Sequence, residues 1–505
     1  MKPLPWKKVL VANRGEIALR VMRTLKRLGI RSVAVYSDAD AGQRHVREAD
    51  EAVRIGPAEA RASYLSIEAV IGAAKLTGAD AIHPGYGFLS ENAAFARACE
   101  EAGITFVGPP AAVLEASADK LAVKRRVAKA GVPVIAGPLD PVAEDPKALA
   151  KAARATGYPL LLKAASGGGG KGMRTVRSEA DLVAAAEGAR REAGGAFGNA
   201  ALYMERLIEG ARHVEVQVLV DRSGQVAVLG ERDCSIQRRH QKVIEESPAP
   251  GLSDAVRRSL HESGAEAARA LGYRNAGTAE LLLAPDGTFS FLEMNRRLQV
   301  EHAVTEACFG VDLVEWQLRI AAGESLPEGG AFVSHGHAVE ARLYAEDPEN
   351  GFLPSSGSVL ALREPEGTGI RVDSALVAGM EVSPHYDPLL AKVIAHGETR
   401  EEAIHRLDLA LRDTAVLGVR TNASFLRAVL ADSEFCAGRL STDLLDRRGA
   451  ALLALGPPPL EAILAAAADE LLPQAGRSGA KGRAKAAARG PWHALKGFRL
   501  SESAS

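Results

Sequence analysis

The sequence predicts an α/β protein that continues into an α+β part, and three stretches of the chain indicate this. Residues 9–36 alternate an apolar strand, an amphipathic helix and a second strand, which is a βαβ unit typical of a parallel sheet. Residues 278–295 have the pattern of a hairpin around Asp286 and Gly287. After Gly323, further strands and two helices predict a second, more antiparallel unit.

The first unit offers a loop rather than a dinucleotide fingerprint. Its helix carries an apolar stripe at residues 17, 21, 25 and 28, but no Gly-x-Gly-x-x-Gly follows the first strand, which disfavours a nucleotide oxidoreductase. Residues 81–91 predict a strand end followed by a loop with two glycines, at the carboxyl edge where such sheets line a cleft. His83 and Tyr86 are candidate contacts there, and loop packing is the alternative.

Two glycine-rich or basic segments follow. Residues 119–129 predict a cationic helix, residues 158–163 a strand, and residues 165–174 a loop with four successive glycines. Glycines let backbone amides approach an anion closely, but the Walker A pattern is missing and a strand follows. We interpret this loop as a flexible lid over phosphates, with a linker as the alternative. The basic run at 237–242 indicates an anion site, or a surface patch balanced by Glu245 and Glu246.

The hairpin predicts a metal site. Counting outward from a two-residue turn at Asp286 and Gly287 sets Glu280 opposite Glu293, and Thr278 opposite Asn295. Directly opposed like charges destabilise an antiparallel pair, so a cation between them is expected. Carboxylate and amide oxygens suit Mg²⁺ or Mn²⁺ held together with substrate phosphates. A solvated strand face whose register slips at a bulge is the alternative.

The same strand is expected to continue beyond Asn295. If the backbone stays extended, alternate side chains share one face. That face would carry Glu293, Asn295, Arg297, Gln299 and Glu301. The sequence therefore predicts one dense polar face over residues 293–301.

Composition limits the function classes. The chain has 505 residues, enough for about three domains, and its net charge of -1 gives no global reason to expect nucleic-acid binding. The four scattered cysteines form no disulfide or metal pattern, which favours a reducing, cytoplasmic location. No signal-peptide core or run long enough to cross a membrane is visible. From residue 456 the composition shifts to Ala, Gly, Lys and Arg, which indicates a linker or tail.

At Lys163, the four glycines, and residues 83–92, 237–242 and 293–302, the chain closely resembles biotin carboxylase, the ATP-grasp component of acetyl-, propionyl- and methylcrotonyl-CoA carboxylases. The match runs in order from about residue 9 to about 448. It implies a Rossmann-like parallel α/β domain at 1–115, an ATP-grasp domain at 116–332 with a mobile lid at about 134–206, a mixed α+β domain at 333–448, and a linker or tail at 449–505.

The resemblance also implies where ATP and metal bind. Lys120 and Lys163 would contact phosphates, Glu205 with neighbouring backbone would hold adenine, and the lid glycines would close over the phosphates. The lid positions are Gly168, Gly169 and Gly170. Three residues would approach the nucleotide, chiefly at the ribose, namely His213, Gln237 and His240. The implied ligands of Mg²⁺ or Mn²⁺ are Glu280, Glu293 and Asn295.

For bicarbonate and biotin, the resemblance implies a second set on the same polar segment. Lys242, Arg297 and the backbone near Gln299 and Val300 would hold bicarbonate, and Glu301 would deprotonate it. Arg342 would stabilise the biotin ureido oxyanion. Cys234 lies near these residues in sequence, but the chemistry needs no thiol, so a structural role is expected.

The implied reaction is the first half-reaction of an acyl-CoA carboxylase, in which biotin on a carrier is carboxylated by way of carboxyphosphate. Biotin attachment needs Met-Lys-Met or a close relative, and no methionine follows Met380, so biotin is expected on another chain. Expected partners are a biotin carboxyl carrier protein or domain, a carboxyltransferase subunit and a second copy in a homodimer. Two alternatives are an ATP-grasp ligase of the carbamoyl-phosphate synthetase type, disfavoured by the lack of an internal repeat, and a non-catalytic scaffold that docks through its tail.

Overall fold

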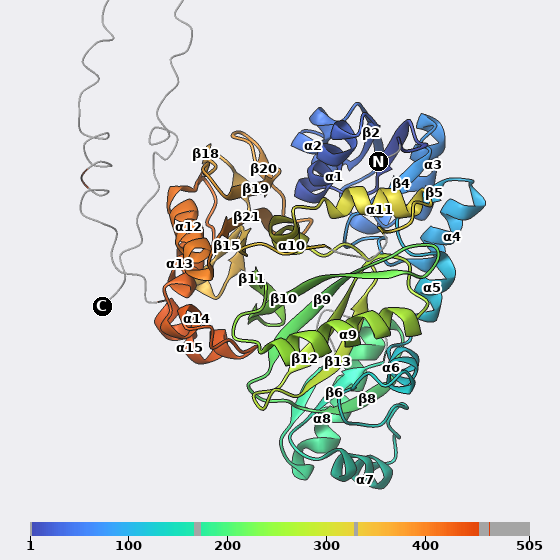
Figure 1. Ribbon diagram of the computed structural model, residues 1–505, viewed down its shortest axis with the longest axis vertical. Coiled ribbons are helices and arrows are strands. Elements are labelled where there is room, and N and C mark those ends of the chain that lie inside the picture. The colour runs from blue at the N-terminus through green and yellow to red at the C-terminus, as the bar shows by residue number, and fades with distance from the viewer. Residues whose placement is uncertain (1–2, 166–172, 328–331, 454–463, 465–505) are drawn as a thin grey trace, which may run out of the picture.

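The computed structural model describes residues 3–165, 173–327, 332–453 and 464. Figure 1 shows three parts grouped around a central sheet: a blue N-terminal part, a teal lobe and an orange C-terminal part. The predicted lid glycines and nearly all of the tail lie outside the described residues. No helix in the described part of the chain is long and apolar enough to cross a membrane.

The N-terminal part is a parallel sheet covered by helices, as predicted. Its strands run in the order β3-β2-β1-β4-β5 and all of their pairings are parallel. The strands are β1 (Lys8–Val11), β2 (Arg31–Ser37), β3 (Glu51–Gly56), β4 (Ala81–His83) and β5 (Thr105–Phe106). The helices include α1 (Gly15–Arg27), α2 (Arg44–Glu48), α3 (Ile67–Thr77), α4 (Ala93–Glu101) and α5 (Ala111–Ala116). The predicted stripe of α1 packs into the core through Ile17, Val21 and Leu25.

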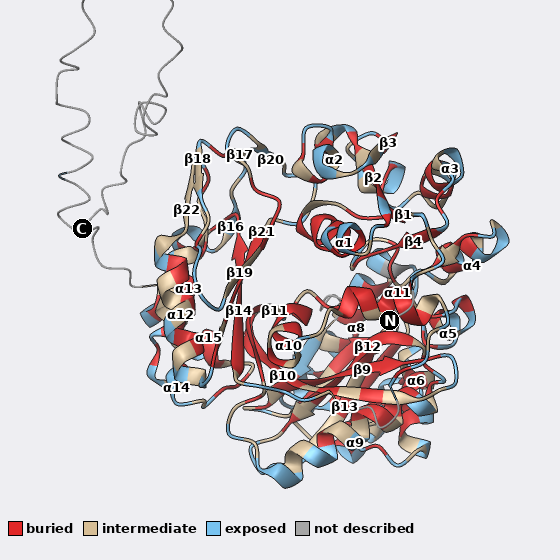
Figure 2. Ribbon diagram, turned by 45° about the horizontal axis from the view of Figure 1, so that its top comes forward, coloured by how far each residue is buried: buried red, intermediate tan, exposed pale blue. Residues whose placement is uncertain are grey.

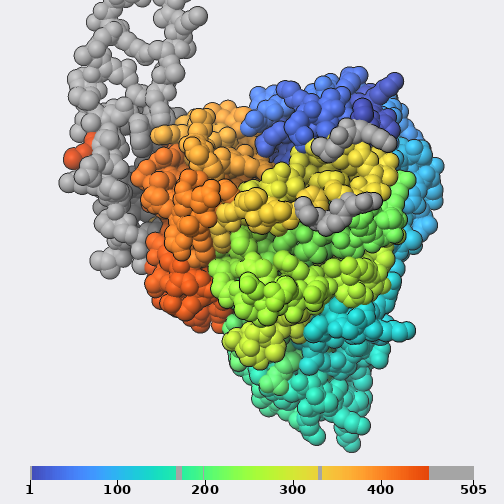
Figure 3. Space-filling view, in the orientation of Figure 1, coloured from blue at the N-terminus to red at the C-terminus, as the bar shows by residue number. Residues whose placement is uncertain are grey.

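A small lobe projects from the body of the molecule, teal at the bottom of Figures 1 and 3. Its antiparallel sheet has the order β7-β6-β8, from β6 (Leu160–Ala164), β7 (Arg174–Val176) and β8 (Leu202–Arg206). The helices α7 (Pro146–Thr156) and α8 (Glu179–Phe197) pack on this sheet around a separate apolar core. Helix α6 (Lys120–Lys129) leads into the lobe.

The centre of the molecule is one antiparallel sheet of eight strands, in the order β13-β12-β9-β10-β11-β14-β21-β19. Its strands from the middle of the chain are β9 (Arg212–Val220), β10 (Val226–Arg238), β11 (Gln241–Ser247), β12 (Asn275–Leu283) and β13 (Phe289–Asn295). Those from the C-terminal part are β14 (His337–Tyr344), β19 (Ile370–Ser374) and β21 (Leu389–Gly397). The predicted second unit after Gly323 is therefore antiparallel, but it extends the same sheet because β14 pairs with β11.

Helices cover this sheet and bury most of its strands, which are red in Figure 2. Among them are α9 (Asp254–Ala270), α10 (His302–Phe309) and α11 (Leu313–Ala321). The C-terminal helices are α12 (Arg400–Asp413), α13 (Ala423–Leu430), α14 (Ser433–Cys436) and α15 (Leu444–Leu452). Short strands β15 (Glu346–Asp347), β16 (Leu353–Pro354), β17 (Gly357–Ser358), β18 (Ala361–Arg363), β20 (Glu381–Val382) and β22 (Ala415–Leu417) complete this part. In β14, Val339, Ala341 and Leu343 face an apolar core with α12, so the alternate residues face the other side.

The predicted register of the hairpin is confirmed, but its turn is different. Glu280 pairs with Glu293 and Thr278 with Asn295, as counting suggested. The loop is longer than two residues, since the backbone amide of Ala284 donates to the carbonyl of Thr288, and a register shift lies between Glu280 and Leu281. The longer loop and the bulge offset each other, so the register at Glu280 is the one expected.

The expectation of one extended face through Glu301 is wrong. Strand β13 ends at Asn295, and residues 296–301 form a loop that turns into α10. The backbone bends because Glu301 occupies the position before the first residue of α10, with a non-extended conformation (φ -80°, ψ 10°). Arg297, Gln299 and Glu301 therefore reach the site from a loop instead of from a strand face.

Candidate functional site

A cavity of about 920 Å³ lies where the central sheet, the loop at 296–301 and the N-terminal part meet. It gathers most of the residues that the sequence predicted, from elements far apart in the chain. The predicted residues that line it are His213, His240, Lys242, Glu280, Glu293, Asn295, Arg297, Gln299, Val300, Glu301 and Arg342. Lys120, Lys163, Glu205 and Gln237 are outside this lining, although Lys120 and Gln237 contact residues within it.

Lys242 is the electrostatic centre of the cavity. Its Nζ donates to Glu215 Oε2 at 2.6 Å, to Glu280 Oε1 at 3.0 Å and to Glu301 Oε1 at 2.6 Å. Burial lowers the pKa of Lys242, but the surrounding carboxylates raise it well above its ordinary value. An ammonium group has three donors, and here each one meets a carboxylate. Lys242 is therefore a fixed cation at the floor of the site.

Glu301 is held as an ionised carboxylate between two cations. Its Oε1 accepts from Lys242, and its Oε2 accepts from Arg342 Nη2 at 2.9 Å. Burial raises the pKa of Glu301, but Lys242, Arg342 and Arg232 together lower it well below the usual range. The group is thus ionised, which is the form that can accept a proton.

The sequence prediction missed Glu215 and Arg232, which support this centre. Arg232 is completely buried and donates to Glu215 Oε1 at 2.6 Å, while Glu215 Oε2 accepts from Lys242. Arg232 also donates to Gln217 at 2.8 Å and to Thr305 at 2.9 Å on α10. A signal was available, because residues 213, 215 and 217 alternate with buried valines and so form one polar row on β9.

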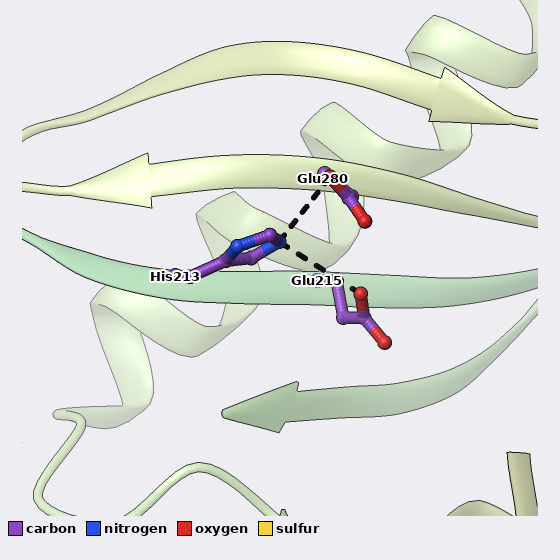
Figure 4. Close-up of side chains that lie close together, drawn as sticks. All are labelled: His213, Glu215 and Glu280. Atoms are coloured by element: carbon purple, nitrogen blue, oxygen red, sulfur yellow. Dashed lines mark ion pairs between the residues drawn. The ribbon is translucent and has the colours of Figure 1, made fainter. Parts of the chain in front are cut away.

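His213 lies between two of these carboxylates (Figure 4). Its Nε2 is 3.3 Å from Glu280 Oε2 and 3.9 Å from Glu215 Oε2, and Gln237 Nε2 donates to its Nδ1 at 2.8 Å. Burial lowers the pKa of His213, but Glu280 and Glu215 raise it, and the net direction is upward. The predicted pair of His213 and Gln237 is therefore brought together at the wall of the cavity.

The predicted metal ligands lie on one end of the hairpin. Glu280 and Glu293 are direct partners across β12 and β13, and Asn295 is two residues further on the same strand face. Glu293 Oε2 accepts from Lys120 Nζ at 2.8 Å. Burial raises the pKa of Glu280, but Lys242 and His213 lower it below its ordinary value. Two carboxylates with an amide whose buried Nδ2 has no partner among the described residues fit a hard divalent cation, since an amide can turn its oxygen inward.

A second group of charges lies toward the lobe. Lys163 Nζ is 2.6 Å from Glu205 Oε2, and Lys124 Nζ contacts the other carboxylate oxygen. Lys163 is on β6 and Glu205 on β8, so the lobe brings these two predicted residues side by side. Lys124 on α6 was not predicted individually. It is one of the lysines of the predicted cationic helix, and it is buried instead of solvated.

The loop at 296–301 is fixed by hydrogen bonds. Arg297 Nη1 donates to Gln299 Oε1 at 2.8 Å and to the Leu298 carbonyl at 3.1 Å. Lys392 Nζ, from β21, donates to the Val300 carbonyl at 2.7 Å. These contacts hold the predicted bicarbonate residues along one wall of the cavity, next to Glu301.

The residues of the basic run at 237–242 do not all lie in the cavity. Arg238 points away from the centre of the cavity, donating to Glu346 at 2.8 Å and stacking over Phe352 at 4.1 Å. The alternative of a surface patch balanced by Glu245 and Glu246 is wrong, because both of these carboxylates are buried. Only residues 239–242 of this run line the cavity.

Three other candidates have clear surroundings. His83 is buried and accepts from the Gly85 backbone at 3.0 Å, as loop packing would require, whereas Tyr86 lines the cavity. Cys234 is buried 3.9 Å from Glu301 Oε1, and burial raises the pKa of its thiol well above the ordinary value. The thiol is therefore protonated and poorly nucleophilic, in keeping with a structural role.

Comparison with known proteins gives three family matches in chain order. Residues 5–114 match the biotin carboxylase N-terminal domain, residues 119–329 match the ATP-binding domain of the carbamoyl-phosphate synthase L chain, and residues 340–447 match the biotin carboxylase C-terminal domain. Together these matches cover most of the chain, including every residue of the cavity described above.

Similar proteins cover most of the same range. Biotin carboxylase of Pseudomonas aeruginosa is 50% identical over 442 residues, which are 87% of this chain and 98% of that protein. The mitochondrial methylcrotonoyl-CoA carboxylase subunit alpha of Dictyostelium discoideum is 45% identical over 505 residues, covering 100% of this chain and 72% of that protein.

Solved structures agree in fold. Biotin carboxylase of Campylobacter jejuni, described as a β,γ-ATP complex, has a TM-score of 0.85 and 43% identity, covering 88% of this chain and 99% of that one. The biotin carboxylase domain dimer of the Hydrogenobacter thermophilus 2-oxoglutarate carboxylase has a TM-score of 0.86 and 44% identity, covering 90% of this chain and 99% of that one. The chain therefore belongs to the biotin carboxylase family.

Proposed function

We propose how the cavity of this biotin carboxylase carries out its reaction, the ATP- and bicarbonate-dependent carboxylation of biotin. The observation that carries the proposal is the cluster of Lys242, Glu301 and Arg342, in which an ionised base lies 2.6 Å from one cation and 2.9 Å from another. The enzyme is an ATP-dependent ligase, and biotin is its substrate, carried by a biotin carboxyl carrier protein or domain. The chemistry needs a proton acceptor, an anion site and an oxyanion site within one cavity.

Bicarbonate is assigned to Lys242, Arg297 and the backbone near Gln299 and Val300. A bound bicarbonate adds a negative charge beside Glu301 and so raises the proton affinity of that carboxylate. Glu301 takes the bicarbonate proton, and the resulting oxyanion attacks the γ-phosphorus of ATP, with ADP as the leaving group. The product, carboxyphosphate, separates into CO₂ and phosphate. A closed site keeps water from this labile intermediate.

In the second step, phosphate takes the proton of the biotin ureido nitrogen, and that nitrogen attacks CO₂. Arg342 is assigned to the ureido oxyanion that forms in between. Its Nη2 already contacts a carboxylate oxygen of Glu301, so it is oriented toward the cavity before biotin arrives. The carbamate forms as the C–N bond closes, with no change of oxidation state.

ATP and metal are assigned to the residues around the hairpin and the lobe. Glu280, Glu293 and Asn295 would hold Mg²⁺ or Mn²⁺, which neutralises phosphate charge during transfer. Lys120 and Lys163 would contact phosphates, and Glu205 with nearby backbone would hold adenine. His213, Gln237 and His240 would lie at the ribose side. Gly168, Gly169 and Gly170 keep their assignment as the lid over the phosphates. The Hydrogenobacter thermophilus structure is described with MgADP and bicarbonate, which supports nucleotide, magnesium and bicarbonate as the molecules bound here.

The domain boundaries, the assembly and the location of the protein are also proposals. The domain boundaries at 115, 332 and 448, the lid at about 134–206, a homodimer, a carboxyltransferase partner and a cytoplasmic location remain proposals. The dimer described for the Hydrogenobacter thermophilus domain supports the homodimer. Three of the four cysteines are buried and all four are free, which agrees with a reducing compartment.

Bicarbonate-dependent ATP cleavage, measured with and without free biotin, tests the proposal. We expect ADP release to require bicarbonate and to rise when biotin is added. Glu301→Gln should lower this rate about 10²-fold to 10⁴-fold, the usual contribution of a general base, and leave nucleotide binding within about twofold. Normal turnover in that variant would refute the assignment of the base. A scaffold would cleave no ATP under either condition.

A further inference from the structure

Behind Arg342 lie two carboxyl groups to which the reaction above gives no role. Glu245 on β11 and Glu340 on β14 are direct partners in the antiparallel pair of these strands. Directly opposed residues have their side chains on the same face, about 5 Å apart at Cβ. Both residues are completely buried. Two ionised carboxylates in this position would repel each other without help from water.

Their hydrogen bonds are incomplete. Glu245 Oε1 accepts from Arg342 Nε at 2.5 Å. Glu245 Oε2 and both oxygens of Glu340 have no hydrogen-bond partner among the described residues. Buried polar atoms are nearly always hydrogen-bonded, so three unpartnered acceptors on two neighbouring carboxyl groups indicate that a donor is missing from the count. A proton on one of the two groups supplies that donor.

The charged groups that face Glu340 do not supply it. Besides Glu245, they are Arg342 on the same strand, Lys392 on β21 and Glu301 before α10, while Lys242 on β11 acts on Glu245. Lys392 directs its Nζ to the Val300 carbonyl at 2.7 Å, with Asp373 and Glu16 at 3.7 and 3.9 Å. The opposite face of β14 meets an apolar core with α12.

The direction of titration agrees with this geometry. Burial raises the pKa of Glu340 well above its ordinary value, and Glu245 and Glu301 add to the rise, while Lys392 and Arg342 lower it in part. Burial also raises the pKa of Glu245 to about 7, although Arg342 opposes the rise.

We propose that Glu245 and Glu340 share one proton, and that this singly charged pair is the support that positions Arg342. The shared proton links Glu340 to Glu245 Oε2, while Glu245 Oε1 keeps its bond to Arg342 Nε. Arg342 then faces one negative charge from the pair instead of two, so its guanidinium stays available to an oxyanion in the cavity. The catalytic meaning of this support rests on the role proposed above for Arg342, but the shared proton itself does not.

Infrared difference spectroscopy tests the proton directly and needs no turnover. We expect the wild-type protein at neutral pH to show a protonated carboxylic acid C=O band, sensitive to D₂O, that is absent from Glu340→Gln. Glu246→Gln is the matched control, because Glu246 is equally buried but accepts from His337 and Arg400 and is ionised. The acid band should remain in that variant. A wild-type minus Glu340→Gln spectrum with ionised carboxylate bands only would overturn the proposal.

Kinetics test what the pair does for Arg342. Glu340→Gln keeps the shape and the neutral form and can donate an N–H to Glu245, so biotin-dependent turnover at pH 7 should stay within twofold of wild type. In the wild-type protein, turnover should fall at alkaline pH when the shared proton is lost. In Glu340→Gln this fall should occur at a pH at least one unit higher. Glu245→Gln removes the anion on Arg342 and should lower biotin-dependent turnover at least tenfold, with KM for ATP within twofold.

A tenfold loss in Glu340→Gln at pH 7, with an unchanged unfolding midpoint, would instead show that an ionised Glu340 is required. Should either variant unfold, the acid band of the wild-type protein decides the proton on its own, because the absence of that band at pH 7 counts against it.

Discussion

Replacement of Lys242 by methionine is the sharpest test of the charge arrangement in the cavity. Methionine keeps most of the apolar stem of the side chain but removes the cation that contacts Glu215, Glu280 and Glu301 at 2.6, 3.0 and 2.6 Å. These carboxylates are buried, so water cannot replace the ammonium group freely. The variant leaves three acids facing one another across the floor of the site.

The expected loss of stability is large. Removing one partner of a buried ion pair costs about 3–5 kcal/mol, because the remaining charge is left uncompensated. We expect Lys242→Met to lower the free energy of unfolding by about this amount at pH 8. Bicarbonate-dependent ATP cleavage should fall at least about 100-fold, since the anion site loses its cation and a protonated Glu301 cannot act as a base.

The loss should depend on pH in a definite direction. In the wild-type protein the folded-state pKa values of Glu280 and Glu301 lie below their ordinary values, so their stabilising contribution is present above the unfolded pKa and disappears as pH falls toward the folded one. Without Lys242 at least one folded-state pKa rises above the unfolded value of about 4.3, so destabilisation grows as pH rises. Both effects make the deficit larger at pH 8 than at pH 5.

Urea unfolding of wild type and variant at pH 5 and pH 8 measures this difference. Lys120→Met is the control, because among the described residues Lys120 forms an ion pair with Glu293 alone, and both side chains are about one-third exposed. Such a pair contributes about 0–1 kcal/mol. A Lys242→Met deficit under about 1 kcal/mol at pH 8, or one that is the same at both pH values, would refute the reasoning.

Three further changes test other parts of the site. Arg232→Lys keeps a positive charge but loses the planar guanidinium group that joins Glu215 to Thr305. The KM for bicarbonate should therefore rise by about 10-fold to 100-fold. An unchanged KM would contradict the role of Arg232. Lys392→Met leaves the partly buried Val300 carbonyl without its donor and should cost about 1–3 kcal/mol in urea unfolding, whereas no loss would mean that another group replaces the lysine. Removal of divalent cations with EDTA should stop ATP cleavage, and Mg²⁺ or Mn²⁺ should restore it. Glu293→Gln should raise the metal concentration needed for half-maximal activity. An unchanged metal requirement in Glu293→Gln would exclude Glu293 as a ligand.

The sequence was most informative where the signal was local. The βαβ unit and the hairpin register were predictable because strand periodicity and turn residues are properties of short segments. The pairing of Glu280 with Glu293 came out as expected only because a longer loop and a bulge offset each other. Counting residues cannot detect two such compensating irregularities. The extended face through Glu301 was wrong for a related reason, since the start of α10 overrides the alternation.

The supporting residues were harder to predict because they come from distant parts of the chain. Lys392 reaches the Val300 carbonyl from 92 residues away, and Glu245 meets Arg342 from a strand 97 residues earlier. The alternation of residues 213, 215 and 217 could have identified Glu215, but nothing local shows that Arg232 lies behind it. Contacts of this kind depend on strand order, which the sequence pattern leaves open.

The shared central sheet has a consequence for how this protein could be divided. Strands β11 and β14 are neighbours, yet the chain between them passes through residues 328–331. A nick in that stretch would yield an N-terminal fragment whose part of the sheet ends at an uncovered β11, and a C-terminal fragment whose part of the sheet ends at an uncovered β14. Each fragment would expose an edge strand with unpaired backbone amides and carbonyls, which can pair with other chains and cause aggregation. The two pieces should therefore be insoluble when made separately and should reassemble when produced together, so that the molecule behaves as a single folding unit in spite of its modular sequence.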